Sequence, residues 1–387
     1  MHLTPHEERI LEGEYGERKR KALEILVTLG KIYGTDKLIP ITTAQLSGVS
    51  FKTMGKEGAA FIRDFSQEKV AVPTFLNPCG MDTKRWEIMG IDETFAHAQT
   101  DLLSDYRKMG VHMSLTCTPY YIRKPKKGEH LAWAESSAVV YANAVCGART
   151  NREGGPSALA AALIGKTPYY GLHLINNRKA EVVVDVKDKV KKEHYGLLGV
   201  YVGKIVGARI PYFLNLTGRG DALKQLGAAM AASGAVAMFH VERVTPEWRR
   251  ALMGKIERMS VTRDDLEETR RSLTNGESPQ LYAFGCPHLS LKEIKEIAGI
   301  LNRKKVCGKI WLFTSRNIKK KASRLGYEKI IEKHGMLVCD TCMVVSPIEN
   351  LFSVTATNSG KAAVYLPSFC KQRVVFGSAK ELLGDGK

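Results

Sequence analysis

The chain has 387 residues, of which 44% are hydrophobic and 25% are charged, and its formal net charge is +18 at pH 7. This composition is globular, and the length suits two or three domains or one large compound domain. No apolar run is long enough to span a bilayer, and the N-terminus "MHLTPHEERI" lacks the basic and apolar regions of a signal peptide. We therefore expect a soluble, cytoplasmic protein.

The first predicted helix opens with a capping box. Thr4 is its N-cap, Pro5 takes the first helical position, and Glu7 follows three residues after the cap. The stretches that begin at Thr262 and Ser290 carry cap signals of the same kind. Because a capping hydroxyl accepts a hydrogen bond from a free backbone N–H group, we expect a helix to start at each of these positions.

Short apolar runs with a strand-like pattern alternate with the helical stretches. They read "KVAVPTF", "GVHMSLTC", "RIPYFLNL", "AVAMFHV", "LYAFGC", "KIWLFT" and "AAVYLPS". Alternating strands and helices predict an α/β fold of several layers with mainly parallel sheets. No linker is evident, so we treat residues 1–387 as one compound region with a subdomain boundary near residues 240–275.

Three cysteines each follow a short apolar stretch. They are Cys117 in "LTCTPYYI", Cys286 in "FGCPHLS" and Cys342 in "CDTC". Ligands of α/β proteins gather at the carboxyl ends of parallel strands, so the three thiols could meet in one crevice. Without a secretory signal, metal binding, catalysis or burial is favoured over disulfides.

Each of these thiols also has a plainer interpretation. Cys117 could be a small buried hydrophobe. The pair Cys339 and Cys342 could be a redox pair, half of a zinc site, or the source of one thiolate for a shared metal. His288, close to Cys286, could be structural or functional. The weaker candidates are Cys79, which is a reserve ligand, and Cys146, Cys307 and Cys370.

Two polar stretches have a composition that suits anions. The first, "GARTNREGGPSAL", contributes Arg149, Thr150, Asn151, Arg152 and Glu153 ahead of a helix start. The second, "TNSGKAAVY", contributes Ser359 and Lys361 in a small loop ahead of a predicted strand. Helix N-termini and forked arginine donors both bind carboxylate or phosphate, although either stretch could also be a flexible polar loop.

The basic runs have two interpretations as well. They read "ERKRK", "RKPKKGEH", "VKDKVKKEH", "NRKK" and "NIKKKASR". Such charge attracts anions, but the runs carry little aromatic interleaving of the kind that single-strand binders use. A solvated, lysine-rich surface is therefore the favoured interpretation, and a basic nucleic-acid-binding scaffold with an inert metal site is a remote alternative.

Together these motifs resemble the aconitase X family, specifically its large, catalytic subunit. The matching stretches keep their order from "LSGVSF" at 46–51 to "TNSGKAAVYLP" at 357–367 and span nearly the whole chain. They include "AESSAVVYANAVCGARTNREGGPSAL" and "GCPHLSLKEI". The resemblance implies a hydro-lyase with an aconitase-like core, and we expect the swivel domain on a separate small subunit.

The resemblance also implies an iron centre held by three thiolates, at the positions of Cys117, Cys286 and Cys342. Cys339 stays open as an alternative to Cys342. We expect a [4Fe-4S] cluster, with [2Fe-2S] or mononuclear iron as alternatives. Three ligands leave one position free, and a Lewis-acidic iron helps a poor leaving group such as hydroxide to depart.

We assign hypothetical roles to the remaining candidate site residues. Arg149 and Arg152, with Ser359 and Lys361, are expected to hold the anionic ends of the substrate, together with Thr150 and Asn151. His288 could orient the substrate or a ligand, and Glu153 could act as acid–base or pair with an arginine. The basic charge of the chain and the expected division of the enzyme into two subunits favour a phosphorylated hydroxy acid as the substrate over a hydroxyproline. The catalytic base could lie on the partner chain.

Overall fold

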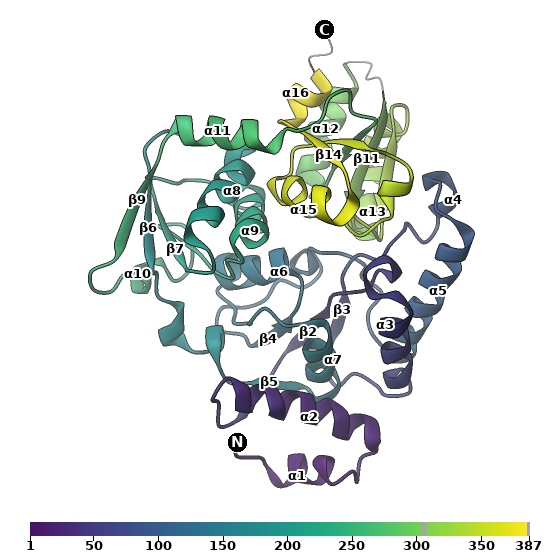
Figure 1. Cartoon of the computed structure of the whole chain (residues 1–387), viewed down its shortest axis with the longest axis vertical. Coiled ribbons are helices and arrows are strands. Elements are labelled where there is room, and N and C mark those ends of the chain that lie inside the picture. Colours follow the sequence, from purple (N-terminus) through teal and green to yellow (C-terminus); the bar gives the residue numbers. More distant parts are fainter. Residues whose placement is uncertain (304–307, 385–387) are drawn as a thin grey trace.

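The computed structural model describes residues 1–303 and 308–384, and the chain folds into three regions, each built on its own parallel sheet (Figure 1). The first region lies at the bottom of the view, the second at the upper left and the third at the upper right. The predicted α/β fold with mainly parallel sheets is confirmed. Cys307 lies outside the described residues.

The first region holds a three-stranded parallel sheet in the order β3–β2–β4. Its strands are β2 (Thr43–Leu46), β3 (Thr74–Leu76) and β4 (Leu131–Trp133), and β1 (Leu38–Pro40) pairs with β5 (Lys166–Pro168) in an antiparallel ribbon. Its helices are α1 (Pro5–Leu11), α2 (Glu17–Ile32), α3 (Phe51–Phe65), α4 (Trp86–Met89), α5 (Glu93–Lys108), α6 (Ser136–Tyr141) and α7 (Gly155–Ile164). A π-helical turn, Ala142–Cys146, continues α6.

The second region holds a four-stranded parallel sheet in the order β8–β7–β6–β9. Its strands are β6 (Val182–Val186), β7 (Pro211–Leu214), β8 (His240–Val241) and β9 (Glu257–Val261). Its helices are α8 (Tyr195–Val206), α9 (Asp221–Gly234), α10 (Trp248–Ala251) and α11 (Arg263–Leu273). Because α9 packs against α8, against α6 of the first region and against α15 of the third, it joins all three regions.

The third region holds a five-stranded parallel sheet in the order β12–β11–β10–β13–β14. Its strands are β10 (Leu281–Phe284), β11 (Lys309–Thr314), β12 (Met336–Cys339), β13 (Val354–Thr357) and β14 (Arg373–Phe376). Its helices are α12 (Leu291–Leu301), α13 (Arg316–Arg324), α14 (Tyr327–Ile331), α15 (Gly360–Cys370) and α16 (Ala379–Gly384). The strand order reverses between β10 and β13, and such a switch point opens a crevice at the carboxyl ends of the strands.

The predicted helix starts are confirmed where capping residues marked them. The Thr4 hydroxyl accepts a hydrogen bond from the Glu7 backbone N–H group, and the side chain of Glu7 bonds back to the cap. Thr262 and Ser290 cap α11 and α12 in the same reciprocal way. The sequence predicts these helix starts correctly because the hydrogen bonds of each cap are formed within one turn of the chain.

Two predicted strands are wrong. The stretch "AAVYLPS" lies inside α15, because Ser359 caps this helix by accepting a hydrogen bond from the Ala362 N–H group. The alanines that follow favour a helix, and they outweigh the strand preference of Val364 and Tyr365. The stretch "GVHMSLTC" is irregular, with one bridge between His112 and Phe75. It ends at Cys117 without forming a regular strand.

Two glycines allow α15 to begin directly on α8. A Cβ atom placed on Gly360 would lie 2.5 Å from the carbonyl oxygen of Gly196, which no real side chain tolerates. Gly360 therefore lets the two backbones touch. This contact fixes the position of the residues on either side of Gly360, Ser359 and Lys361, relative to the second region.

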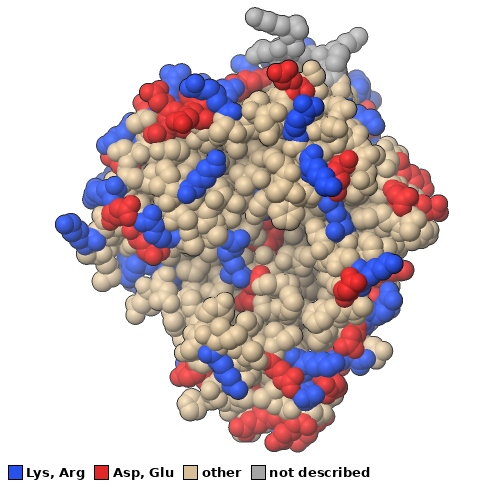
Figure 2. Space-filling view, viewed as in Figure 1, with Lys and Arg blue, Asp and Glu red and all other residues tan. Residues whose placement is uncertain are grey.

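The charged side chains on the face shown in Figure 2 alternate in sign around the edge, and the middle carries few of them. No continuous basic patch covers this face, which agrees with a solvated, lysine-rich surface. Within the described ranges, no helix is both long enough and apolar enough to cross a membrane.

Candidate active site

Three thiols predicted as ligands lie close together at the carboxyl ends of strands. Cys286 follows β10, Cys342 follows β12, and Cys117 ends a segment attached to β3 through a hydrogen bond of 2.9 Å from the Thr116 N–H group to the Leu76 carbonyl oxygen. The backbone N–H group of His288 donates to the Cys117 sulfur at 3.2 Å. The fold therefore brings together segments separated by more than 160 positions.

The ionisation of these thiols reflects their proximity. Burial raises the pKa of Cys117, and the Glu135 carboxylate and the sulfurs of Cys342 and Cys286 raise it further. Burial likewise raises the pKa of Cys286, with the nearby Lys361 ammonium opposing the shift. The metal-free thiols therefore stay protonated near neutral pH, and a metal that binds them must displace their protons.

Small exposed fractions separate these thiols from most other cysteines. Cys117, Cys286 and Cys342 are 6%, 3% and 8% exposed, whereas Cys79 and Cys339 are 0% exposed. The three thiols are therefore nearly but not completely buried, as is Cys146 at 6%.

His288 joins two of the segments that carry these thiols. Its Nε2 atom lies 2.9 Å from the Thr341 carbonyl oxygen, which can only accept, so this nitrogen carries the proton. Its Nδ1 atom then accepts a hydrogen bond of 2.9 Å from the Thr116 hydroxyl. Burial lowers the pKa of His288 to about 4, so the ring is neutral. These contacts favour a positioning role, and the predicted catalytic role of His288 stays a prediction.

The turn that carries Cys342 is held by a network of charges. Asp340 has a left-handed backbone with a φ of 64°. Its carboxylate pairs with Arg316 and accepts a hydrogen bond of 2.6 Å from the Thr83 hydroxyl. The Asp82 carboxylate accepts from the Cys339 N–H group at 2.9 Å and from Arg316 at 2.9 Å. The turn is therefore fixed on both sides of Asp340.

The structure distinguishes the two cysteines of this turn. Cys339 is the last residue of β12, and its thiol pKa is raised by burial and by the carboxylates of Asp340 and Asp82. The thiol of Cys342 instead interacts with Lys361 and Glu135, as Cys117 and Cys286 do. The described contacts therefore group Cys342, and not Cys339, with the other two thiols.

Ser359 lies at the switch point of the third sheet. It follows β13, which is the neighbour of β10, and its hydroxyl donates to the Cys286 carbonyl oxygen. The same hydroxyl accepts from the Ala362 N–H group at 3.0 Å and caps α15. Ser359 thus connects the first turn of a helix to the segment that carries a thiol.

Lys361 forms a buried ion pair with Glu135 beside the thiols. The Lys361 ammonium also lies 3.1 Å from the Ser136 hydroxyl. Burial opposes the charge on Lys361, but the Glu135 carboxylate outweighs it and raises the pKa of Lys361. The same pair lowers the pKa of Glu135 against the effect of burial. Both groups are therefore charged at neutral pH.

Glu135 was not among the site residues predicted from the sequence. This residue lies two positions after the end of β4 and caps α6 by accepting a hydrogen bond from the Ala138 N–H group at 2.6 Å. An acidic residue between the apolar "LAW" and the helical "SSAVVY" was a usable signal. It is the same pattern, a polar residue at the end of a strand, that marked the cysteines.

The loop "GARTNREGGPSAL" runs along β4, and its side chains form hydrogen bonds with neighbouring residues of the first region. The Thr150 hydroxyl accepts from the Trp133 N–H group at 3.0 Å, and the Asn151 amide donates to the Tyr170 carbonyl oxygen at 3.2 Å. Arg152 is exposed. None of these described contacts reaches the thiols, so the predicted substrate roles of these residues stay predictions.

Glu153 and Arg149, from the same loop, lie in different surroundings. The Glu153 carboxylate accepts hydrogen bonds from Ser157 at 2.6 Å and Thr167 at 3.1 Å, and burial raises its pKa. The backbone of Arg149 forms a parallel β-bridge with His130, just before β4. Glu135 instead follows the end of that strand. Within the described contacts, Arg149 and Glu153 therefore have different partners.

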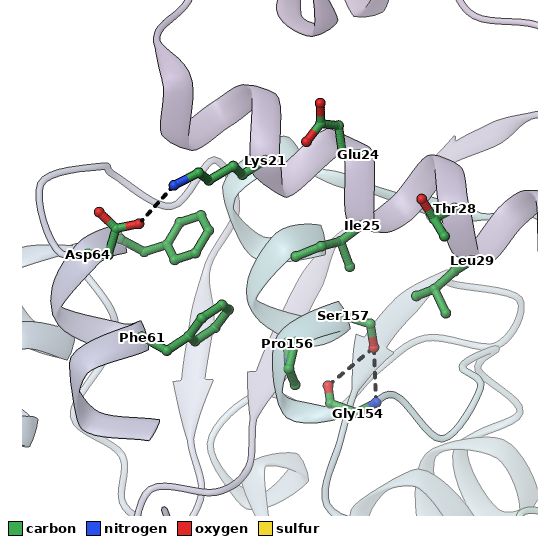
Figure 3. Close-up of a pocket in the computed structure, with 11 residues that line it drawn as sticks. Lys21, Glu24, Ile25, Thr28, Leu29, Phe61, Asp64, Gly154, Pro156 and Ser157 are labelled. Carbon is green, nitrogen blue, oxygen red and sulfur yellow. Dashed lines mark hydrogen bonds and ion pairs between the residues drawn. The ribbon is translucent and has the colours of Figure 1, made fainter. Parts of the chain in front are cut away.

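An apolar cavity of about 700 Å³ lies between α2, α3 and the start of α7 (Figure 3). Ile25, Leu29, Phe61 and Pro156 point toward it, and an ion pair of 3.6 Å between Lys21 and Asp64 lies at one edge. The described lining includes no cysteine or histidine. Among its charged lining residues, Lys21 pairs with Asp64 and Glu24 pairs with Arg20, so these groups already have ion-pair partners.

The donor chemistry of the three thiols suits a multi-iron cluster. Across residues 1–303 and 308–384, no three His, Cys, Asp or Glu side chains are arranged to hold a single metal ion. Thiolates are the usual protein ligands of iron–sulfur clusters, so the three neighbouring thiols are chemically suited to hold one.

Comparison with known proteins gives consistent matches along the chain. Models described as "Aconitase X first domain", "second domain" and "third domain" match residues 1–176, 180–271 and 279–385. "Phosphomevalonate dehydratase large subunit" from Methanocaldococcus jannaschii is 53% identical over 99% of each chain. A "Cis-3-hydroxy-L-proline dehydratase" from Pseudomonas aeruginosa is 34% identical over 97% of this chain and 68% of its own.

A solved structure extends the similarity to three dimensions. The structure titled "Crystal structure of Thermococcus kodakaraensis aconitase X (holo-form)" covers 100% of both chains, with a TM-score of 0.95 and 48% sequence identity. The arrangement of the three regions is therefore shared with that protein over the full length.

Proposed function

The chain belongs to the aconitase X family, and from this premise we propose that it is the large subunit of a phosphomevalonate dehydratase. The reaction removes water from (R)-5-phosphomevalonate to give trans-anhydromevalonate 5-phosphate, in an archaeal mevalonate route to isoprenoids. The observation that carries the proposal is the similarity to the relative of that name, 53% identical over 99% of each chain.

We assign Cys117, Cys286 and Cys342 as the ligands of an iron–sulfur cluster, with [4Fe-4S] as the leading type. Their proximity and their small exposed fractions support this assignment. When bound, the cluster supplies the Lewis acidity that helps the substrate's hydroxyl group to leave. His288 and the charge network around Asp340 hold the ligand segments in register.

Lys361 and Ser359 suit the carboxylate of the substrate. Ser359 begins a helix of 11 residues, and the N-terminus of such a helix favours an anion. Lys361 keeps its charge because Glu135 raises its pKa. In the reaction the carbon next to the carboxylate loses a proton, and a carboxylate held by these groups takes up part of the developing negative charge.

The catalytic base is expected on another chain. The pKa of Glu135 is lowered by Lys361, which makes this carboxylate a weak base. We propose that a separate small subunit supplies the swivel domain and the base, in agreement with relatives that are named large subunits. The predicted roles of residues 149–153 in substrate binding and catalysis stay predictions.

The test is an assay of the purified complex with both candidate substrates. The chain is produced anaerobically with its small subunit and given (R)-5-phosphomevalonate or cis-3-hydroxy-L-proline, and the products are identified by mass spectrometry. We expect loss of one water from the phosphorylated substrate. Turnover of hydroxyproline alone would overturn the assignment.

The hydroxyproline activity is the second candidate because relatives of that name match 97–98% of this chain. They are 33% and 34% identical, and the chain covers 67% and 68% of their length. The lower identity and the partial coverage place this function after the phosphorylated substrate.

A further inference from the structure

A cationic cavity of about 520 Å³ lies between the loop before β4 and helix α10, away from the thiols. Its cationic lining residues are Lys127, Arg149, Arg178, Lys179, Arg249 and Arg250. Glu247 is the one acidic residue among the described residues of the lining. Lys127, Arg249 and Arg250 are exposed, so the cavity opens to solvent, and its excess of positive charge attracts anions.

The acidic residue of this cavity is already paired. The Glu247 carboxylate accepts a hydrogen bond of 2.8 Å from Arg178, which is buried. Arg178 directs its other nitrogens to the backbone oxygens of Leu172, Asn143 and Ala148. These two residues therefore neutralise each other, and within the described part of the chain none of the other five cations forms an ion pair with a carboxylate.

Arg149 has an unused donor at this place. Its Nη1 atom donates to the His173 carbonyl oxygen at 3.2 Å, but its Nε atom is buried without a hydrogen-bond partner among the described residues. The pKa of His173 is lowered to about 3 by burial, by His130 and by the charges of Arg178 and Arg149. A buried, charged donor without an acceptor is costly, and an anionic ligand would satisfy it.

We propose that this cavity binds a diphosphate group, either as inorganic diphosphate or as part of a small diphosphate ester. The five cations that form no ion pair carry more positive charge than a single carboxylate could offset. They therefore suit an anion with several negative charges. Arginine forks match the oxygens of phosphate groups in a bidentate way. The described lining contains no Phe, Tyr or Trp, whereas sites for single-stranded nucleic acid rely on aromatic stacking.

The cavity is separate from the proposed active site. Arg149 is bridged to His130, before β4, and Glu135 follows the other end of the strand. Five residues of extended chain span about 16 Å, which is too far for one small substrate to fill both places. The diphosphate site is therefore additional to the dehydratase activity.

The experiment is isothermal titration of the full chain with its small subunit, using sodium diphosphate, sodium phosphate and a short single-stranded oligonucleotide in turn. The test variant is Lys127→Gln/Arg250→Gln, which removes one lysine and one arginine from the cavity. The control variant is Lys329→Gln/Arg107→Gln, which removes the same charges from exposed positions on α14 and α5. Thermal unfolding without ligand checks that both variants are folded.

We expect one diphosphate per chain, weaker binding of phosphate, and an affinity at least about tenfold lower in the cavity variant, with no change in the control. The variant Cys117→Ser should bind diphosphate as tightly as the parent, which separates this proposal from the proposed function. Absence of diphosphate binding, equal binding by the two double variants, or tighter binding of the oligonucleotide would overturn the proposal.

Discussion

The loops at 149–153 and 358–361 are similar in composition but have different surroundings. Ser359 and Lys361 lie beside thiols at the switch point of a parallel sheet, in contact with Cys286 and Glu135. Arg149 lies at the start of β4, and Glu153 bonds inside the first region. Local composition thus identifies residues able to bind an anion, whereas the partners that each side chain meets in the fold determine whether it contacts the thiol segments.

The largest effect is expected at the thiols. Replacing Cys117 or Cys286 by serine should remove most of the bound iron and lower the activity by about a thousandfold or more, because the Lewis acid is lost. Iron analysis and the dehydratase assay measure both. Cys146→Ser is the control, since this thiol lies in the π-helical turn after α6. Equal iron in the Cys117 and Cys146 variants would contradict the assignment.

A smaller effect is expected at the ion pair of the second loop. Lys361→Met leaves the Glu135 carboxylate buried and unpaired, so the free energy of unfolding should fall by about 3 kcal/mol. The double variant Glu135→Gln/Lys361→Met should recover part of this stability but none of the activity. Denaturant unfolding and kinetics test the cycle. Recovery of both properties would show that the pair has only a structural role.

The next effect concerns the pH dependence of stability. The pKa of His288 is about 4 in the folded chain and about 6.5 when unfolded, so the unfolded chain gains the proton first as the pH falls. Its contribution to the free energy of unfolding is complete above pH 6.5 and decreases by about 3 kcal/mol as the pH falls to 4. His288→Gln should flatten this slope in the metal-free chain.

His240 provides a matched control for this measurement. Its pKa is also lowered to about 4 by burial, and its ring contacts the Arg178 carbonyl oxygen at 2.8 Å, away from the thiols. His240→Gln should flatten the pH dependence by a similar amount and leave the iron content unchanged. His288→Gln should lower the iron content as well, because the link between Thr116 and Thr341 is lost. Equal iron contents in the two variants would contradict a positioning role for His288.

The smallest effect is expected in the first loop. Glu153→Gln keeps the shape of a buried carboxyl group that bonds to Ser157 and Thr167, so kcat/KM should change by less than about twofold. Glu135→Gln, in the same assay, should lower it strongly. A loss of more than tenfold in the Glu153 variant would support the predicted acid–base role of Glu153 and weaken the contrast between the loops.

The sequence was most informative where the signal is local. The caps at Thr4, Thr262 and Ser290 are satisfied within one turn, and they were predicted correctly. The α/β class followed from the alternation of strands and helices. The stretch after Ser359 was predicted as a strand because Val364 and Tyr365 favour strands, yet the cap and the contact with α8 make it a helix.

The site was predictable only in part because it depends on distant segments. Apolar stretches that end in cysteine pointed to the thiols. No local pattern could reveal that His288 joins Thr116 to Thr341, or that Lys361 pairs with Glu135 across 226 positions. The separation of Arg149 from Lys361 follows from the direction of β4, which the sequence does not encode locally.

The most direct test of the central claim compares the two cysteines of the "CDTC" turn. Cys342→Ser and Cys339→Ser change the same atom three residues apart, but only Cys342 interacts with Lys361 and Glu135 beside the other thiols. Iron and acid-labile sulfide per chain are measured after anaerobic purification. We predict that the Cys342 variant loses most of both and that the Cys339 variant keeps them. Loss in the Cys339 variant with retention in the Cys342 variant would contradict the proposed ligand set.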